Sequence, residues 1–275
     1  MPSSDISRTD PLQWLNRVAG SEPSRPFLTI PGARTISYGE FDRLSNRLAQ
    51  ALVRSGVTTG DRVTAQTDKS PEAIALYIAC LKAGAVFVPL NTAYTLAELE
   101  YFLDDAQPRI AVVRPQTLSD ITAARPAIRF ETLNDKDGGS LMQRAAQCNE
   151  TPPPTEGIDQ SSLAALLYTS GTTGRSKGAM LTRGNLASNA VTLAAAWRFS
   201  EADILLHALP IFHVHGLFVA VNTVLASGSS INFLPSFDAA VFVTPASVRA
   251  RPAEELARRF GGHVAESVEA GLRRA

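Results

Sequence analysis

The segment Tyr168–Gly178, which reads YTSGTTGRSKG, is the most informative stretch of this sequence. It continues the apolar run Leu163–Thr169, and it is dense in glycine, serine and threonine around Lys177, one of only four lysines in the chain. Glycines let a backbone approach an anion closely, amides and hydroxyl groups donate hydrogen bonds, and a lysine adds positive charge. The composition therefore favours a phosphate-binding loop delivered by a buried strand over a flexible surface turn.

The spacing of this loop differs from that of a Walker A loop. In a Walker A loop the lysine follows a glycine and precedes Ser or Thr. Here Lys177 follows Ser176 and precedes Gly178. A P-loop kinase is therefore the weakest of the phosphate-binding alternatives.

Helix-like and strand-like segments alternate along the chain on both sides of this loop. Ser37 with Glu40, and Thr95 with Glu98, have the spacing of a capping box, which marks a helix start. Helices are expected between Ser37 and Gly56 and over residues 71–82, 96–105, 183–197 and 214–226. Strands are expected over residues 62–67, 85–89, 109–113, 163–169, 204–208 and 230–234. This alternation predicts an α/β fold with a parallel sheet covered by helices.

Other positions give weaker signals. Residues 114–160 have the composition of turns and linkers and are expected to form a long connection. Lys69 and Lys82 are expected to be solvated surface charges. Cys80 lies in an apolar run and is expected in the core, and two cysteines are too few for a disulfide framework.

Composition excludes several classes of protein. A hydrophobic content of 45% excludes general disorder, and the balance of 26 basic against 26 acidic residues gives no overall attraction to nucleic acid or to an anionic membrane. The apolar run around Cys80 is shorter than the roughly 18 residues of a membrane span. The N-terminus lacks the apolar stretch of a signal peptide. A cytoplasmic protein without nucleic-acid partners or a membrane span is expected.

The Tyr168–Gly178 segment also resembles the phosphate-binding signature of the adenylate-forming (AMP-binding) superfamily, which includes acyl-CoA synthetases, luciferases and peptide-synthetase adenylation domains. Ser176 stands where that signature generally has proline. Further segments are similar to other motifs of this superfamily: Ile36–Glu40, Lys82–Asn91 and Leu209–Leu217. The residue sequences of three segments are most similar to those of malonyl-CoA synthetases: Asn91–Thr95, Arg175–Leu181 and His213–Gly216.

The resemblance implies a fold, an activity and a set of site residues. The fold would be the early part of the large N-terminal domain of an adenylate-forming enzyme. The ATP β- and γ-phosphates would be held by Thr169, Ser170, Gly171, Thr172, Thr173 and Gly174. Lys177 would supply the catalytic positive charge, and His213 would flank the acyl pocket. His215 would either join that pocket or serve as a half-buried structural histidine, and no third ligand accompanies the pair as a metal site.

By this resemblance the protein is an ATP-dependent acid–CoA ligase connected with fatty acid metabolism. It would use ATP, Mg²⁺ and coenzyme A to convert a small carboxylic acid, malonate or a similar dicarboxylate, into a thioester. No arginine lies between Arg198 and Arg249, so this part of the chain offers none to pair with the second carboxylate of a dicarboxylate. The choice of malonate therefore rests on the similarity to malonyl-CoA synthetases.

Residues 1–238 are expected to form a partial AMP-binding N-terminal domain, and residues 239–275 an Ala/Arg-rich tail that a frameshift would explain. The later motifs of the superfamily are missing. A domain that stops near residue 238 would leave one sheet short of strands and an apolar face unburied, so marginal stability or aggregation is expected. The alternative function is a catalytically inactive fragment that at most binds nucleotide or a partner chain.

Overall fold

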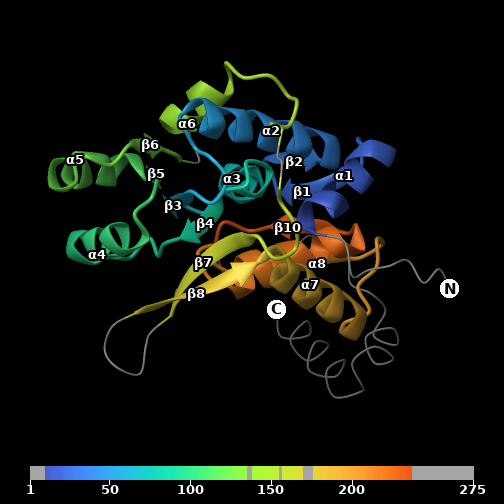
Figure 1. Ribbon diagram of the computed structural model, residues 1–275. Helices are drawn as coiled ribbons and strands as arrows, with labels where there is room; N and C mark the ends of the chain where they lie inside the picture. Colours follow the sequence, from blue (N-terminus) through green and yellow to red (C-terminus); the bar gives the residue numbers. More distant parts are fainter. Residues whose placement is uncertain (1–9, 135–137, 155–156, 170–175, 237–275) are drawn as a thin grey trace, which may run out of the picture.

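The structure is a computed structural model that describes residues 10–134, 138–154, 157–169 and 176–236. Two β-sheets and the helices packed on and between them make up this part of the chain (Figure 1). The α/β class predicted from the sequence is confirmed. None of the helices in these ranges combines the length and the apolar character needed to cross a lipid bilayer.

The larger sheet has six strands in the order β6-β5-β3-β4-β7-β8. They are β3 (Arg62–Gln66), β4 (Val86–Pro89), β5 (Ile110–Val113), β6 (Phe130–Thr132), β7 (Leu163–Thr169) and β8 (Lys177–Thr182). All neighbouring strands are parallel except β7 and β8, which form an antiparallel hairpin at one edge. The prediction of a parallel sheet is therefore correct for its first five strands.

The second sheet has four strands in the order β2-β1-β10-β9. They are β1 (Pro26–Ile30), β2 (Arg34–Ser37), β9 (Ile204–His207) and β10 (Ser230–Phe233). The pair β1 and β2 is antiparallel, whereas β10 lies parallel to both β1 and β9. This sheet joins the beginning of the described chain to its end.

The helices lie on both faces of the larger sheet. They are α1 (Pro11–Ser21), α2 (Tyr38–Arg54), α3 (Pro71–Lys82), α4 (Leu96–Ala106), α5 (Pro115–Ala124), α6 (Gly139–Ala145), α7 (Arg183–Ala196) and α8 (Ala220–Ser227), and a π-helical turn (His215–Val219) precedes α8. Both expected capping boxes are present, at Ser37 for α2 and at Thr95 for α4. The helix expected over residues 214–226 is thus divided into two parts.

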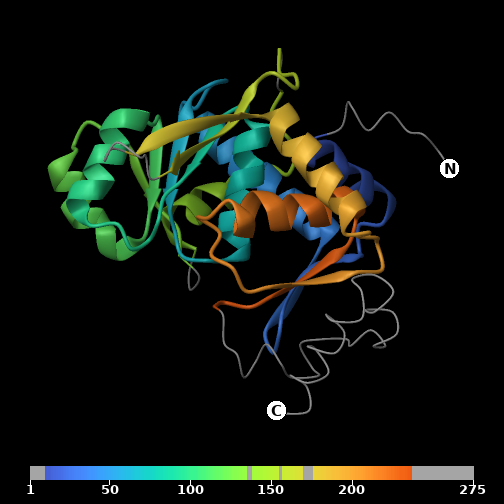
Figure 2. The same cartoon turned by 90° about the horizontal axis from the view of Figure 1, so that it is seen from below.

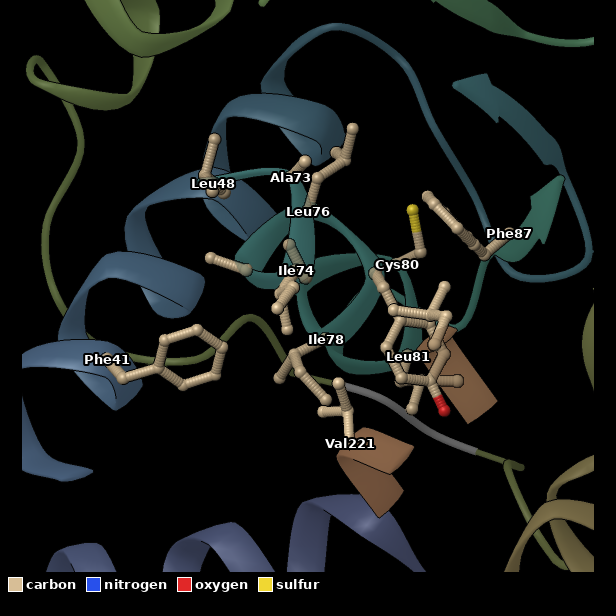
Figure 3. Close-up of a cluster of buried hydrophobic side chains, with 14 of the residues drawn as sticks. Phe41, Leu48, Ala73, Ile74, Leu76, Ile78, Cys80, Leu81, Phe87 and Val221 are labelled. Atoms are coloured by element: carbon tan, nitrogen blue, oxygen red, sulfur yellow. The ribbon is translucent and has the colours of Figure 1, made fainter. Parts of the chain in front are cut away.

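Helix α3 forms the centre of the main core. All of its residues except Glu72 are buried, and Cys80 is among them, as predicted. Side chains of α2, α3, β4 and α8 gather there; Phe41, Ile78, Phe87 and Val221 are examples (Figure 3). Helices α4 and α5 pack on the opposite face of the six-stranded sheet, so this sheet is covered on both sides (Figure 2).

The structure corrects the expectation of a long connection over residues 114–160. Helix α5, strand β6 and helix α6 lie within this range. Helices α5 and α6 begin without a side-chain cap, at Arg114 and Gly138 respectively. Strand β6 has only three residues. Of the signals that mark α2, α3 and α4, only a first-turn proline is present here, as Pro115 of α5.

The prediction that Lys82 is a solvated surface charge is also corrected, because Lys82 is buried. Its side chain is 4% exposed, and its Nζ donates to Asp42 Oδ1 at 2.5 Å and to Asn46 Oδ1 at 2.6 Å. Burial lowers the pKa of Lys82, and the carboxylate of Asp42 opposes this shift. Since α2 carries both partners, this lysine joins α3 to α2.

Candidate functional site

The β7–β8 hairpin brings the two ends of the Gly/Ser/Thr-rich segment together. Thr169 and Lys177 are paired residues of the two strands, and Thr169 Oγ1 donates to the Lys177 carbonyl oxygen at 3.5 Å. Both side chains are exposed. The remaining predicted phosphate ligands lie outside the described residues: Ser170, Gly171, Thr172, Thr173 and Gly174. The hairpin thus presents a hydroxyl group and an ammonium group, both suited to an anion, at its loop end.

Strand β8 is not among the strands predicted from the sequence, although Gly178 leaves room for its pairing with β7. A Cβ atom at Gly178 would lie 2.9 Å from Leu166 Cδ1, so a larger residue there would displace the Leu166 side chain. Residues 177–180 are exposed and carry no alternating apolar pattern. Pairing with β7 therefore decides the conformation of this segment.

Helix α4 contacts β7 and the residue that precedes β8, near the loop end of the hairpin. The Tyr168 hydroxyl donates to Asp105 Oδ2 at 2.6 Å, and the Tyr101 hydroxyl donates to the Ser176 carbonyl oxygen at 3.3 Å. The rings of Phe102 and Tyr168 pack with their centroids 4.6 Å apart. Burial, followed by the hydrogen bond to Asp105, raises the pKa of Tyr168.

The two predicted pocket histidines lie side by side. Their Nδ1 atoms are 3.3 Å apart, and the backbone N–H of His215 also donates to His213 Nδ1 at 3.3 Å. Both side chains are exposed, which corrects the alternative of a half-buried His215. The structure therefore brings His213 and His215 together as a pair of polar groups open to solvent.

His207 is a further residue of this region, and it is not among the site residues predicted from the sequence. It is buried at the end of β9, and its Nε2 lies 2.6 Å from the carbonyl oxygen of Gly216. Because a carbonyl only accepts, Nε2 carries the proton. A Cβ atom at Gly216 would overlap the carbonyl oxygen of Pro210. His207 and this close approach together fix the turn that carries the two exposed histidines.

Lys69 contacts the backbone of His207 and is not the solvated surface charge that the sequence predicts. Its Nζ donates to the carbonyl oxygens of His207 at 2.9 Å and Leu234 at 2.6 Å, and it lies 4.5 Å from the ring centroid of Phe233. Burial lowers the pKa of Lys69 to about 7. Lys69 lines two cavities, of about 600 Å³ and 260 Å³, beside the carboxyl ends of parallel strands, where ligands of α/β proteins commonly bind.

Acidification is expected to destabilise the fold through His207. Burial, and secondarily the charge of Lys69, lowers the pKa of His207 from 6.5 to about 4. The unfolded chain therefore takes up the proton first, so the stabilisation is complete above pH 6.5 and is lost as the pH falls through about 4. The full effect is about 3 kcal/mol.

Chemical unfolding between pH 7 and pH 4 measures this effect. The variant His207→Gln keeps an N–H donor for the Gly216 carbonyl but does not titrate, so its stability is expected to depend less on pH than that of the parent. Equal pH dependence in both proteins would contradict the assignment.

Comparison with known proteins agrees with this architecture. The sequence pattern of the family described as "AMP-binding enzyme" matches residues 15–250. The ATP-bound crystal structure of MatB from Rhodopseudomonas palustris is similar with a TM-score of 0.79 and 46% identity; the match covers 86% of this chain and 47% of MatB. The fold is therefore that of the N-terminal domain of adenylate-forming enzymes, as the resemblance implied.

Two curated relatives are acid–CoA ligases by name. The indoleacetate–CoA ligase of Aromatoleum aromaticum is 34% identical over 235 residues, which are 82% of this chain and 45% of that protein. The malonate–CoA ligase of Arabidopsis thaliana is 28% identical over 225 residues, which are 74% of this chain and 36% of that protein. The chain thus spans less than half the length of each of these relatives.

Proposed function

Since the chain belongs to the AMP-binding enzyme family, we propose that it binds ATP at the β7–β8 hairpin and acts in the ATP-dependent ligation of a carboxylic acid to coenzyme A. The observation that carries this proposal is the pairing of Thr169 and Lys177 at the loop end of the hairpin, where the two strands are connected. One residue offers a hydroxyl donor and the other an ammonium group, and a segment rich in glycine and hydroxyl residues connects them. This donor set fits a phosphate chain.

In the proposed reaction a carboxylate oxygen attacks the α-phosphorus of ATP, which forms an acyl-adenylate and releases pyrophosphate. The sulfur of coenzyme A then displaces AMP from the acyl carbon. Lys177 and Thr169 would hold oxygens of the departing pyrophosphate and stabilise the negative charge that develops on it. Mg²⁺ would accompany ATP and neutralise part of the phosphate charge.

The proposed acid is malonate or a similar small dicarboxylate. Support comes from the similarity of the segments Asn91–Thr95 and His213–Gly216 to malonyl-CoA synthetases, and from the malonate–CoA ligase among the relatives. The exposed histidine pair would supply donors to a carboxylate of the acid. The indoleacetate–CoA ligase among the relatives makes the choice of acid a matter for direct measurement.

Carboxylate-dependent exchange of labelled pyrophosphate into ATP tests the proposed function. The chain is incubated with MgATP and with malonate, acetate or a longer fatty acid in parallel. Exchange that is fastest with malonate supports the ligase and its acid, whereas faster exchange with another acid supports the ligase alone. Binding of ATP without exchange would favour the alternative of a nucleotide-binding protein that does not activate an acid.

Replacement of Lys177 by alanine is expected to weaken ATP binding by roughly 10- to 150-fold. The lost contact is a charge-assisted hydrogen bond, which contributes about 1.5–3 kcal/mol. The fold is expected to stay intact, because Lys177 is exposed at the start of an edge strand. Calorimetric titration with MgATP measures the affinity.

Arg54→Ala provides the matched control, since it removes one exposed positive charge from the end of α2. It is expected to bind ATP like the parent. Equal affinity in Lys177→Ala and Arg54→Ala would show that Lys177 does not contact the nucleotide.

A further inference from the structure

We infer that Tyr101 and Asp105 of helix α4 are positioning residues that set the distance between Thr169 and Lys177. This inference rests on the proposed function, because it assigns to α4 the placement of the two ends of the ATP-binding hairpin. It extends the site to a helix that none of the segments resembling the superfamily motifs includes.

Each of the two contacts lies one residue from a proposed phosphate ligand. Tyr101 donates to the carbonyl oxygen of Ser176 at 3.3 Å, immediately before Lys177. Asp105 accepts from the Tyr168 hydroxyl at 2.6 Å, immediately before Thr169. The two helix residues are four apart and therefore lie on the same face of α4. One helix face thus contacts β7 and the residue that leads into β8.

The hairpin needs this support because β8 pairs only with β7 among the described strands. Residues 177–180 of β8 are exposed, and a strand end with few buried contacts opens locally at little cost. Two hydrogen bonds from a folded helix limit this opening. Lys177 and Thr169 then meet a phosphate chain in a fixed geometry, without first having to be ordered.

Helix α4 is itself held firmly enough to serve as an anchor. Its N-terminus carries the capping box of Thr95 and Glu98. The ring of Phe102 packs against Tyr94 and Tyr168 with centroid distances of 4.6 Å in both cases, and against Tyr101 at 5.2 Å. The aromatic cluster therefore joins α4 to β7 directly beside the two hydrogen bonds.

Two variants of the full chain test the inference. Tyr101→Phe removes one hydroxyl group, and Asp105→Ala removes the acceptor of Tyr168. Each is expected to weaken MgATP binding about 2- to 10-fold, as the loss of one hydrogen bond does. Each is also expected to speed hydrogen exchange at the amides of residues 177–180, while exchange in β3 and β5 stays unchanged.

Two further variants are controls. Asp105→Asn keeps an acceptor for the tyrosine hydroxyl and is expected to restore both the affinity and the slow exchange. Tyr94→Phe changes another tyrosine of the same aromatic cluster and is expected to behave like the parent. Thermal unfolding is expected at similar temperatures for all four variants, which separates positioning from a general loss of stability.

The outcomes distinguish the inference from the proposed function. If the unaltered chain binds no ATP, the proposed function fails and the inference fails with it. If the chain binds ATP, unchanged affinity in Tyr101→Phe and Asp105→Ala overturns the inference alone, whether or not exchange in β8 becomes faster. Weaker binding together with faster exchange, both reversed in Asp105→Asn, supports it.

Discussion

Replacing Asp42 with alanine is expected to lower the free energy of unfolding by about 3–5 kcal/mol, because the variant leaves Lys82 buried without its counter-charge. The Lys82 side chain is 4% exposed, and its ammonium group lies 2.5 Å from Asp42 Oδ1. Asn46 accepts another hydrogen bond from the same nitrogen but carries no charge to balance it. Denaturant unfolding measures the difference.

Two comparisons sharpen this prediction. Asp104→Ala breaks an ion pair with Arg125 at the surface, where solvent screens the charges, and is expected to change stability little. Lys82→Met removes the buried charge itself and keeps most of the side-chain volume, so it is expected to cost less than Asp42→Ala. Equal stability in Asp42→Ala and Asp104→Ala would contradict the buried ion pair.

Replacing Arg183 with alanine is also expected to lower the free energy of unfolding by about 3–5 kcal/mol, because it leaves Asp10 without its charged partner. Arg183 Nη1 lies 2.8 Å from Asp10 Oδ2, and Nη2 donates to the carbonyl oxygen of Leu81. Asp10 also caps α1 by accepting from the backbone amides of Leu12 and Gln13. This arginine therefore connects α7, which follows the hairpin, to α1 and to the end of α3.

A double-mutant cycle with Asp10→Asn measures the coupling between the two charged side chains. The amide still offers an oxygen for capping α1, so the cycle reports mainly on the ion pair. Unfolding by denaturant is expected to give the double variant a smaller loss than the sum of the two single losses. Additive losses would show that Arg183 and Asp10 act independently.

The elements that could be predicted from the sequence are those with local signals. Helices α2, α3 and α4 begin at a capping box or at a proline in the first turn, and each starts where the sequence indicates. Helix α1 carries the same kind of signal, with Asp10 as cap and Pro11 in the first turn, so it could have been predicted as well. Strand β8 could not, because its conformation depends on pairing with β7.

Buried charges escaped prediction for a related reason. The partners of Lys69 are carbonyl groups more than 130 residues away in the sequence, at the ends of β9 and β10. The partners of Lys82 lie on another helix. A sequence shows that a lysine is present, but the tertiary fold decides whether it reaches water.

The residues of the candidate site also fall into those that the sequence predicts and those that depend on tertiary contacts. The chemistry of Thr169 and Lys177 is visible in the sequence because the loop composition itself suits phosphate. The roles of His207, Tyr101 and Asp105 depend on contacts between separate elements, and none of these residues lies in a segment that stands out by composition. Their assignment therefore required the structure.

Amide hydrogen exchange of the full chain, with and without MgATP, is the most direct test of nucleotide binding at the hairpin. ATP is predicted to slow exchange at the facing ends of β7 and β8, around Thr169 and Lys177. The same ATP concentration is predicted to give much weaker protection in Lys177→Ala. ATP binding that protects other parts of the chain and leaves these strand ends unchanged would contradict the assignment.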